Sequence, residues 1–105
     1  MTLNNFTDLA MRKASQSICR FRVAAVGLNY KGEIVGTSFN RPRFSRYGGG
    51  LHAERILIER YGNKLSTIIL CRINRTGGLL PIHPCKSCQK LLDKMGIRVY
   101  SISNI

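Results

Sequence analysis

The sequence predicts an α/β fold, a three-layer α/β/α arrangement in which three helices cover a mixed four-stranded sheet. Segments with helical spacing of apolar residues alternate with short β-branched runs, in the order helix, strand, strand, helix, strand, helix, strand. The first two strands form a hairpin and are antiparallel, whereas strand–helix–strand connections favour parallel neighbours with right-handed crossovers. We therefore expect the sheet order 2-1-3-4, with the fourth strand at an edge that another chain can pair with.

The N-terminal part of the chain predicts one helix and one hairpin. Residues 7–19 place apolar and small side chains on one face at helical spacing, while the basic and polar side chains point away. Residues 23–30 form an apolar run that predicts a strand, and Lys31-Gly32 marks a tight turn after it. Residues 33–39 then predict the returning strand of the hairpin.

The middle of the chain predicts a loop, a helix and a buried strand. Residues 40–50 are rich in Arg, Pro and Gly, a composition typical of a loop. A helix is expected over residues 51–61, and Gly62 closes it. Residues 66–73 are mostly apolar and β-branched, which is typical of a strand covered on both faces.

The C-terminal part predicts a second loop, a helix and the last strand. Residues 74–83 contain a Gly-Gly pair and are expected to form the loop. A helix follows over residues 85–95, and Gly96 ends it. Residues 97–102 then predict the fourth strand.

Charge is the unusual feature of the composition. Seventeen Lys and Arg residues oppose five Asp and Glu residues, which gives a net charge of +12 at pH 7. This imbalance favours an anionic partner, a nucleic acid or a nucleotide phosphate. The alternative is a basic surface that only keeps the protein in solution. No apolar run approaches the roughly 18 residues of a membrane helix, and residues 1–8 lack a signal-peptide pattern, so we expect a cytoplasmic protein without a membrane partner.

Two short motifs bring together residue types that bind zinc. His52-Ala53-Glu54 opens the second predicted helix, and Pro84-Cys85-Lys86-Ser87-Cys88 opens the third. Imidazole and thiolate groups bind zinc tetrahedrally, and a catalytic site keeps its fourth position for water. His52, Cys85 and Cys88 supply three such ligands. Zinc lowers the pKa of its water to about 7, and Glu54 is expected to shuttle protons as the catalytic acid and base.

Two other interpretations of these residues are open at this point. A structural zinc site would need a fourth ligand, for which His83 and Cys71 are the candidates. A Cys-x-x-Cys pair can also be a redox site, although that would leave His52 and Glu54 unexplained. The remaining cysteines, Cys19 and Cys71, lie in apolar segments and are expected to be buried free thiols.

With these motifs the chain resembles the cytidine and deoxycytidylate deaminase superfamily, which includes the tRNA adenosine deaminases. The resemblance covers nearly the whole chain and is strongest over residues 39–54 and 84–102. It implies a cytidine deaminase-like domain over residues 1–105, minimal because relatives usually carry a fifth strand that is missing here. It also implies zinc as cofactor, hydrolytic deamination of a nucleobase, and a contact from Asn40 to the substrate's sugar or base.

The sequence leaves two classes of substrate open. Arg41, Arg43 and Arg46 lie in the loop before the second helix and are expected to contact substrate, because Arg forks suit phosphate. His83, directly before Pro84, either contacts substrate as well or only caps the loop. A cytosine nucleoside or nucleotide is the first reading, by resemblance to small stand-alone enzymes of this superfamily. Cytosine or adenine in single-stranded DNA or RNA is the alternative that the charge favours. A third class is a deaminase fold that binds nucleic acid without turnover. The edge strand and the small size also predict a homo-oligomer.

Overall fold

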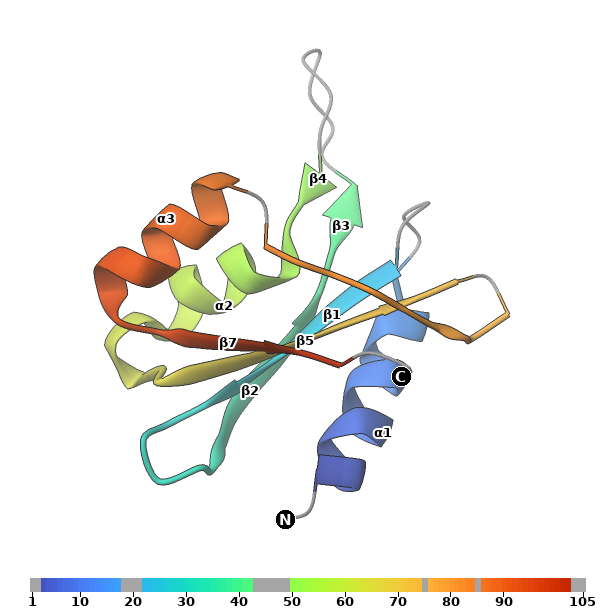
Figure 1. Ribbon diagram of the computed structural model, residues 1–105, viewed down its shortest axis with the longest axis horizontal. Helices are drawn as coiled ribbons and strands as arrows, with labels where there is room; N and C mark the ends of the chain where they lie inside the picture. Colours follow the sequence, from blue (N-terminus) through green and yellow to red (C-terminus); the bar gives the residue numbers. More distant parts are fainter. Residues whose placement is uncertain (1–2, 18–21, 43–49, 75, 85, 103–105) are drawn as a thin grey trace.

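The computed structural model describes residues 3–17, 22–42, 50–74, 76–84 and 86–102 of the chain (Figure 1). Helices and strands alternate along it much as the sequence predicts. The elements are α1 (Leu3–Ser15), β1 (Arg22–Leu28), β2 (Ile34–Phe39), β3 (Arg41–Pro42), β4 (Gly50–Leu51), α2 (Ala53–Tyr61), the 3₁₀ turn η1 (Gly62–Lys64), β5 (Thr67–Ile73), β6 (Leu79–Leu80), α3 (Lys86–Met95) and β7 (Arg98–Ser101).

The main sheet has the predicted order. β2 pairs with β1, β1 pairs with β5, and β5 pairs with β7, so the four strands expected from the sequence lie in the order 2-1-3-4. The sheet also contains β6, where we expected only a loop. β6 pairs with the last two residues of β5, and β7 pairs with the first four, so the two short strands share one edge of β5.

Strand direction corrects one detail of the prediction. Of the two helical crossovers, only the one through α3 joins parallel neighbours, β5 and β7. The crossover through α2 leads from β2 to β5, and β1 lies between these two strands and runs antiparallel to both. The hairpin has already reversed the chain before α2, so the strand that follows α2 pairs with β1 in the opposite direction.

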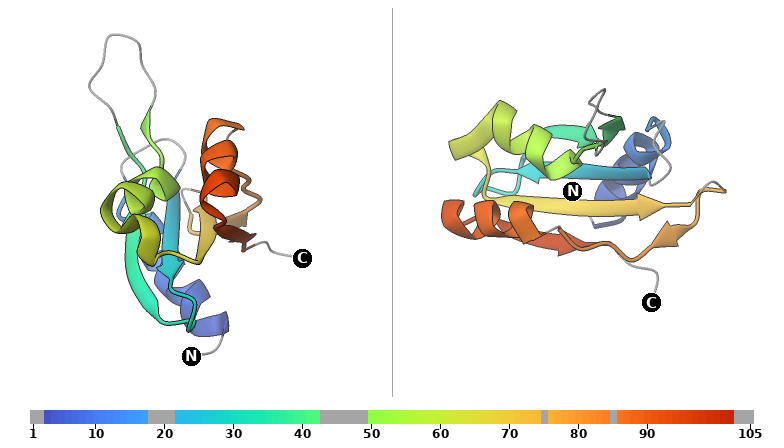
Figure 2. Two further views of the ribbon diagram at one scale, coloured as in Figure 1. Left: turned by 90° about the vertical axis from the view of Figure 1, so that its left-hand side faces the viewer. Right: turned by 90° about the horizontal axis from the view of Figure 1, so that it is seen from above.

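Alternate side chains of the central strands serve two separate cores. Ile68 and Leu70 of β5 pack with α2 and α3 on one face of the sheet. Ile69 and Cys71 of the same strand pack with α1 on the other face. The period of two along a strand produces this division. The arrangement is the predicted α/β/α layering, with α2 and α3 together and α1 apart from them (Figures 1 and 2).

The first helix is displaced from its prediction. α1 spans Leu3–Ser15 rather than residues 7–19, so it begins and ends earlier than expected. Ser17 is buried, and its hydroxyl donates to Asn40 at the end of β2. At Ser17 the chain has already left the helix, which ends at Ser15. Residues 18–21, which include the rest of the predicted helix end, lie outside the described residues.

The other elements agree with their predicted bounds to within one or two residues. Gly62 and Gly96 end α2 and α3 as predicted, with φ of +43° and +71°. A positive φ is the conformation that glycine adopts most readily after a helix. The region predicted as loop 40–50 contributes β3 and β4, which pair with each other. Residues 43–49 between these strands are outside the described part.

Two further observations concern the exterior. None of the described helices is both long enough and apolar enough to cross a membrane. Among the described strands, β7 pairs only with β5, as expected for an edge strand. A second chain at this edge stays a prediction.

Candidate metal centre

The N-terminus of α2 positions the first motif. The chain enters α2 from β4, and His52 is the N-cap residue with an extended backbone, φ −76° and ψ 141°. Ser38 of β2 donates a hydrogen bond from Oγ to the carbonyl oxygen of Ala53, at 2.5 Å. This buried contact holds the first turn of α2 against the sheet and therefore fixes where the His52 and Glu54 side chains begin.

The side chains of Glu54 and His52 meet although they are only two residues apart. Two such residues would point in different directions on a regular helix. His52 has an extended backbone, however, and a side chain in the first turn leans toward the helix N-terminus. Glu54 Oε1 consequently lies 3.6 Å from His52 Nδ1. Glu54 is 4% exposed, so its carboxylate faces the protein interior.

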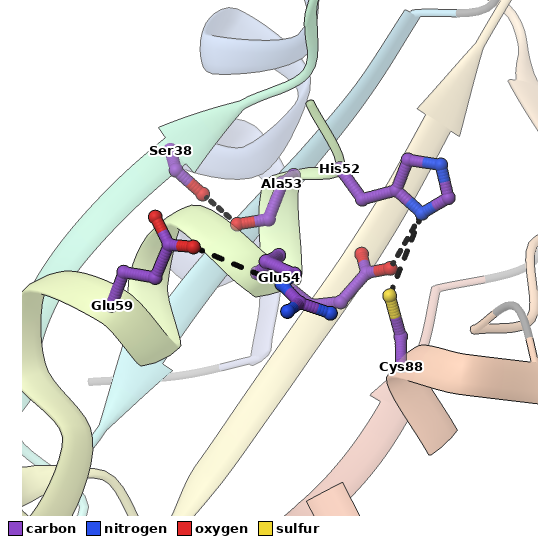
Figure 3. A network of polar contacts seen from close by, with 7 residues as sticks. Ser38, His52, Ala53, Glu54, Glu59 and Cys88 are labelled. Carbon is purple, nitrogen blue, oxygen red and sulfur yellow. Dashed lines mark hydrogen bonds and ion pairs between the residues drawn. The ribbon is translucent and has the colours of Figure 1, made fainter. Parts of the chain in front are cut away.

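Cys88 reaches the same place from α3. It is the third residue of that helix and is 2% exposed. Its Sγ lies 3.5 Å from Nδ1 of His52, the nitrogen that also faces Glu54 (Figure 3). Ligand atoms of His52, Glu54 and Cys88 all lie within 4.8 Å of one another. Because the His52 side chain is 48% exposed, the group has two buried members and one that is open to solvent.

The donor set and its spacing suit zinc. Thiolate and imidazole are ligands that zinc accepts, with bonds of about 2.3 Å to sulfur and about 2.0 Å to nitrogen. Two such ligands on one tetrahedral ion are separated by about 3.5 Å, as these bond lengths require. The observed separation of Cys88 Sγ and His52 Nδ1 is 3.5 Å. The residues therefore fit the metal without rearrangement of these two ligands.

The other predicted ligands and their alternatives are placed differently. Cys85, the third predicted ligand, lies outside the described residues and directly precedes α3. Cys71 lies in the core between the sheet and α1, on the face opposite to α2 and α3. Burial raises the pKa of the Cys71 thiol to about 11, which favours the neutral thiol over a metal-binding thiolate. His83 is exposed and is not part of the described ligand group.

The residues predicted to contact substrate are described only in part. Arg43 and Arg46 lie outside the described residues, and for Arg41 the backbone is described, in β3, but the side chain is not. His83 lies in the segment that leads to α3, with an exposed side chain. Contacts of Arg41, Arg43, Arg46 and His83 with a substrate stay predictions.

Asn40 has a structural role that the sequence did not reveal. Its Oδ1 accepts hydrogen bonds from the Val23 backbone N–H at 2.9 Å and from Ser17 Oγ at 2.7 Å. These contacts join the end of β2 to the start of β1 and to the residues that follow α1. The partners are 17 and 23 residues away along the chain, so no local pattern indicates them. The predicted contact of Asn40 with substrate stays a prediction.

Comparison with protein families identifies the domain. A family model described as the cytidine and deoxycytidylate deaminase zinc-binding region matches residues 1–103. The chain belongs to this family. The deaminase family match agrees with the His52, Glu54 and Cys88 group in indicating zinc as the cofactor. No curated protein sequence matches the chain significantly.

Solved structures of the same deaminase family resemble the fold. A glutamate-to-glutamine mutant of cytidine deaminase from Mycobacterium tuberculosis is 26% identical, with a TM-score of 0.66 over 100% of this chain and 88% of that one. Cytidine deaminase from Mycobacterium leprae is 22% identical, with a TM-score of 0.63 over 93% and 87% of the two chains, and shows similarity of fold alone. Unmutated Mycobacterium tuberculosis cytidine deaminase is 27% identical, with a TM-score of 0.55 over 91% and 83%.

Proposed function

We propose that this chain hydrolyses the exocyclic amine of cytosine in a nucleoside or nucleotide, releasing ammonia and leaving uracil. The observation that supports the proposal most directly is the convergence of Glu54, His52 and Cys88. A buried carboxylate, an imidazole and a thiol from two helices have their ligand atoms within 4.8 Å of one another. The cytidine deaminases of similar structure support cytosine as the base.

The proposed metal ligands are His52, Cys85 and Cys88. Cys88 lies in the first turn of α3, where the positive end of the helix dipole favours a thiolate. Bound zinc would supply hydroxide at neutral pH by lowering the pKa of a water molecule to about 7. With three protein ligands, one coordination position is left for that water.

Glu54 is the proposed proton shuttle. Its carboxylate is held beside His52 Nδ1, at 3.6 Å, without a hydrogen bond of normal length between them. The carboxylate is thus placed to accept the proton of a water molecule and pass it to N3 of the base. Addition of the hydroxide at C4 and cleavage of the C4–amine bond then complete the reaction. Glu54 takes the second proton from the hydroxyl now bonded to C4, which becomes the carbonyl of uracil, and gives it to the amine, which leaves as ammonia, so the carboxylate returns to its starting state.

An ammonia-release panel tests the proposal. The full, zinc-loaded chain is incubated with cytidine, deoxycytidine, their monophosphates, and single-stranded oligonucleotides that contain cytosine or adenine. We expect ammonia and the uracil product from at least one of the cytosine nucleosides or nucleotides. Release of ammonia from none of these substrates would contradict the proposal and favour a deaminase fold that only binds nucleic acid.

A second candidate is deamination of cytosine or adenine within a single strand. The observation that favours it is the net charge of +12, because one nucleotide phosphate needs only one or two cations. The two candidates differ in their dependence on salt. For single strands, a plot of log affinity against log salt concentration has a slope of about −0.7 for each phosphate contacted. Turnover of a free nucleoside should show no such dependence on salt.

A further inference from the structure

Three exposed lysines form a row along α3. Lys86, Lys90 and Lys94 are four residues apart, and all three are exposed. Residues four apart are neighbours on one side of a helix. The buried residues of α3, Cys88 and Leu92, face the core. None of the three lysines forms an ion pair with another described residue.

The stability of α3 does not account for this row. Lys86 is the first residue of the helix, where the dipole is positive and a cation is unfavourable. Like charges four residues apart destabilise a helix further. Asp93, the acidic residue of α3, accepts a hydrogen bond from Gln89 at 2.8 Å instead of pairing with a lysine. Lys86 and Lys90 therefore stand where their charge costs helix stability, which points to a role for the charge itself.

Three basic residues on the other two helices have a simpler explanation. Arg12 and Lys13 lie in the last turn of α1, and Arg60 lies in the last turn of α2. Cations there stabilise the negative end of the helix dipole. Lys94 has the same explanation at the end of α3, but Lys86 does not.

The row also has the length of a short stretch of nucleic acid. With a rise of about 1.5 Å per residue, the three lysines span about 12 Å along the helix. A stacked strand carries a phosphate about every 3.4 Å, so three or four phosphates fit along that length. The row begins at the N-terminal end of α3, the end that carries Cys88, although Lys86 lies on the exposed side of the helix and Cys88 on the buried side.

From this placement we infer that the α3 lysine row, Lys86, Lys90 and Lys94, binds the phosphate backbone of single-stranded nucleic acid that passes the candidate metal centre. A free nucleotide would not need three cations in a line. The bases of a single strand are unpaired and can turn away from the backbone, so one of them can enter the site at the end of the row. The inference rests on the second candidate function, deamination of a base within a single strand, because the row serves as a substrate path only if the site acts on a base of that strand.

The experiment measures binding without requiring turnover. Fluorescence anisotropy of a labelled single-stranded oligonucleotide, in DNA and RNA forms, is recorded with the full zinc-loaded chain over a range of salt concentrations. The test variant combines Lys86→Gln, Lys90→Gln and Lys94→Gln. The control variant combines Arg12→Gln, Lys31→Gln and Arg60→Gln, which removes the same charge from α1, from the β1–β2 turn and from the end of α2. Zinc content and melting temperature are recorded for both variants.

We expect the test variant to bind the oligonucleotide at least about tenfold more weakly. The slope of log affinity against log salt concentration should become less steep by about 2, because three phosphate contacts at about 0.7 each are lost. The melting temperature of the test variant should not fall, because lysine repulsion has been removed from α3. The control variant should change binding much less. The inference would be overturned if both variants lost affinity equally, or if the test variant lost none. It would also be overturned if the unmodified chain bound a duplex as tightly as a single strand. A chain that binds strands through the row but releases no ammonia would contradict the proposed function instead.

Discussion

The Cys88 thiol and the His52 imidazole lie 3.5 Å apart, Sγ to Nδ1, although 36 residues separate them in the sequence. Each residue stands at the N-terminal end of a helix, His52 as the N-cap of α2 and Cys88 in the first turn of α3. The sheet beneath these helices brings the two ends together. The fold thus places these two candidate metal ligands side by side.

Replacement of Glu54 by Gln should abolish turnover and leave zinc in place. Gln keeps the shape of the side chain but cannot accept and return a proton. The expected loss in kcat is about 100- to 10,000-fold, the usual contribution of a general acid or base. Ammonia release and zinc content are measured together. Glu59→Gln on the same helix is the control, because its side chain is 67% exposed and should not affect turnover. Retained activity in Glu54→Gln would eliminate the proposed shuttle.

Replacement of Cys88 by Ala should remove the metal and lower stability. Zinc binding is coupled to folding, so a chelator should reduce the melting temperature of the unmodified chain. In Cys88→Ala the chelator should have little further effect. Zinc affinity should fall by more than the roughly 10- to 100-fold typical of residues that only support a ligand. Cys71→Ala is the control, since Cys71 is buried on the opposite face of the sheet and should leave zinc affinity unchanged.

Replacement of Asn40 by Ala should destabilise the fold by about 1–3 kcal/mol, because a partly buried donor, the Val23 N–H, loses its acceptor. The Ser17 hydroxyl loses Asn40 Oδ1 but keeps the backbone carbonyl of residue 40 as an acceptor. Asn74→Ala is the matched comparison. Asn74 Oδ1 also accepts several hydrogen bonds, but in an exposed turn where water can replace it. Urea unfolding should therefore show the larger loss for Asn40→Ala, and equal losses would contradict this account.

Replacement of Gly36 by Ala should loosen the packing of α2 on the edge of the sheet. A Cβ at Gly36 would overlap the ring of Tyr61, so the ring must move. Overpacking of this kind costs about 1–3 kcal/mol. Combining Gly36→Ala with Tyr61→Ala in a double-mutant cycle should recover part of the loss, because the clash is then absent. If the losses of stability in the two single variants simply add in the double variant, the Tyr61 ring is not what disfavours a side chain at position 36.

The buried Cys71 thiol should make stability fall at alkaline pH. Its pKa is raised from 9.0 to about 11 in the folded chain by burial. An unfolded chain releases this proton above pH 9, while the folded chain holds it until about pH 11. The folded state therefore binds more protons in this window, and the free energy of unfolding decreases as pH rises. Urea unfolding from pH 8 to pH 11 should show a steeper decline in the unmodified chain than in Cys71→Ala.

Local chemistry explains which parts of the fold could be predicted. The apolar run of β5 and the glycines that close α2 and α3 act through neighbouring residues, and these elements were predicted nearly to the residue. The strand order followed from the hairpin and the two crossovers. β6 was missed because two leucines are too short a run to indicate a strand; only pairing with β5 makes them one.

Long-range contacts account for the rest. The position of α1 depends on Ser17, whose hydrogen bonds join it to a residue 23 positions away. The bond from Ser38 to Ala53, which holds the first turn of α2, spans 15 positions. Neither contact has a sequence signature. For the candidate site, the helix-start positions of His52, Glu54 and Cys88 were predictable from the two motifs, whereas their roles in binding and catalysis stay predictions for the experiments above.

The shared edge of β5 has a mechanical consequence for the third helix. β6 precedes α3 and β7 follows it, and both are hydrogen-bonded to the same strand. The segment between these two strands, which contains α3, is thus attached to β5 at both of its ends. Because each of these strands is held by its own pairing with β5, movements of α3 that would separate Cys88 from His52 are restrained at both ends of the segment. Amide exchange in α3 should accordingly follow the opening of these two short strands.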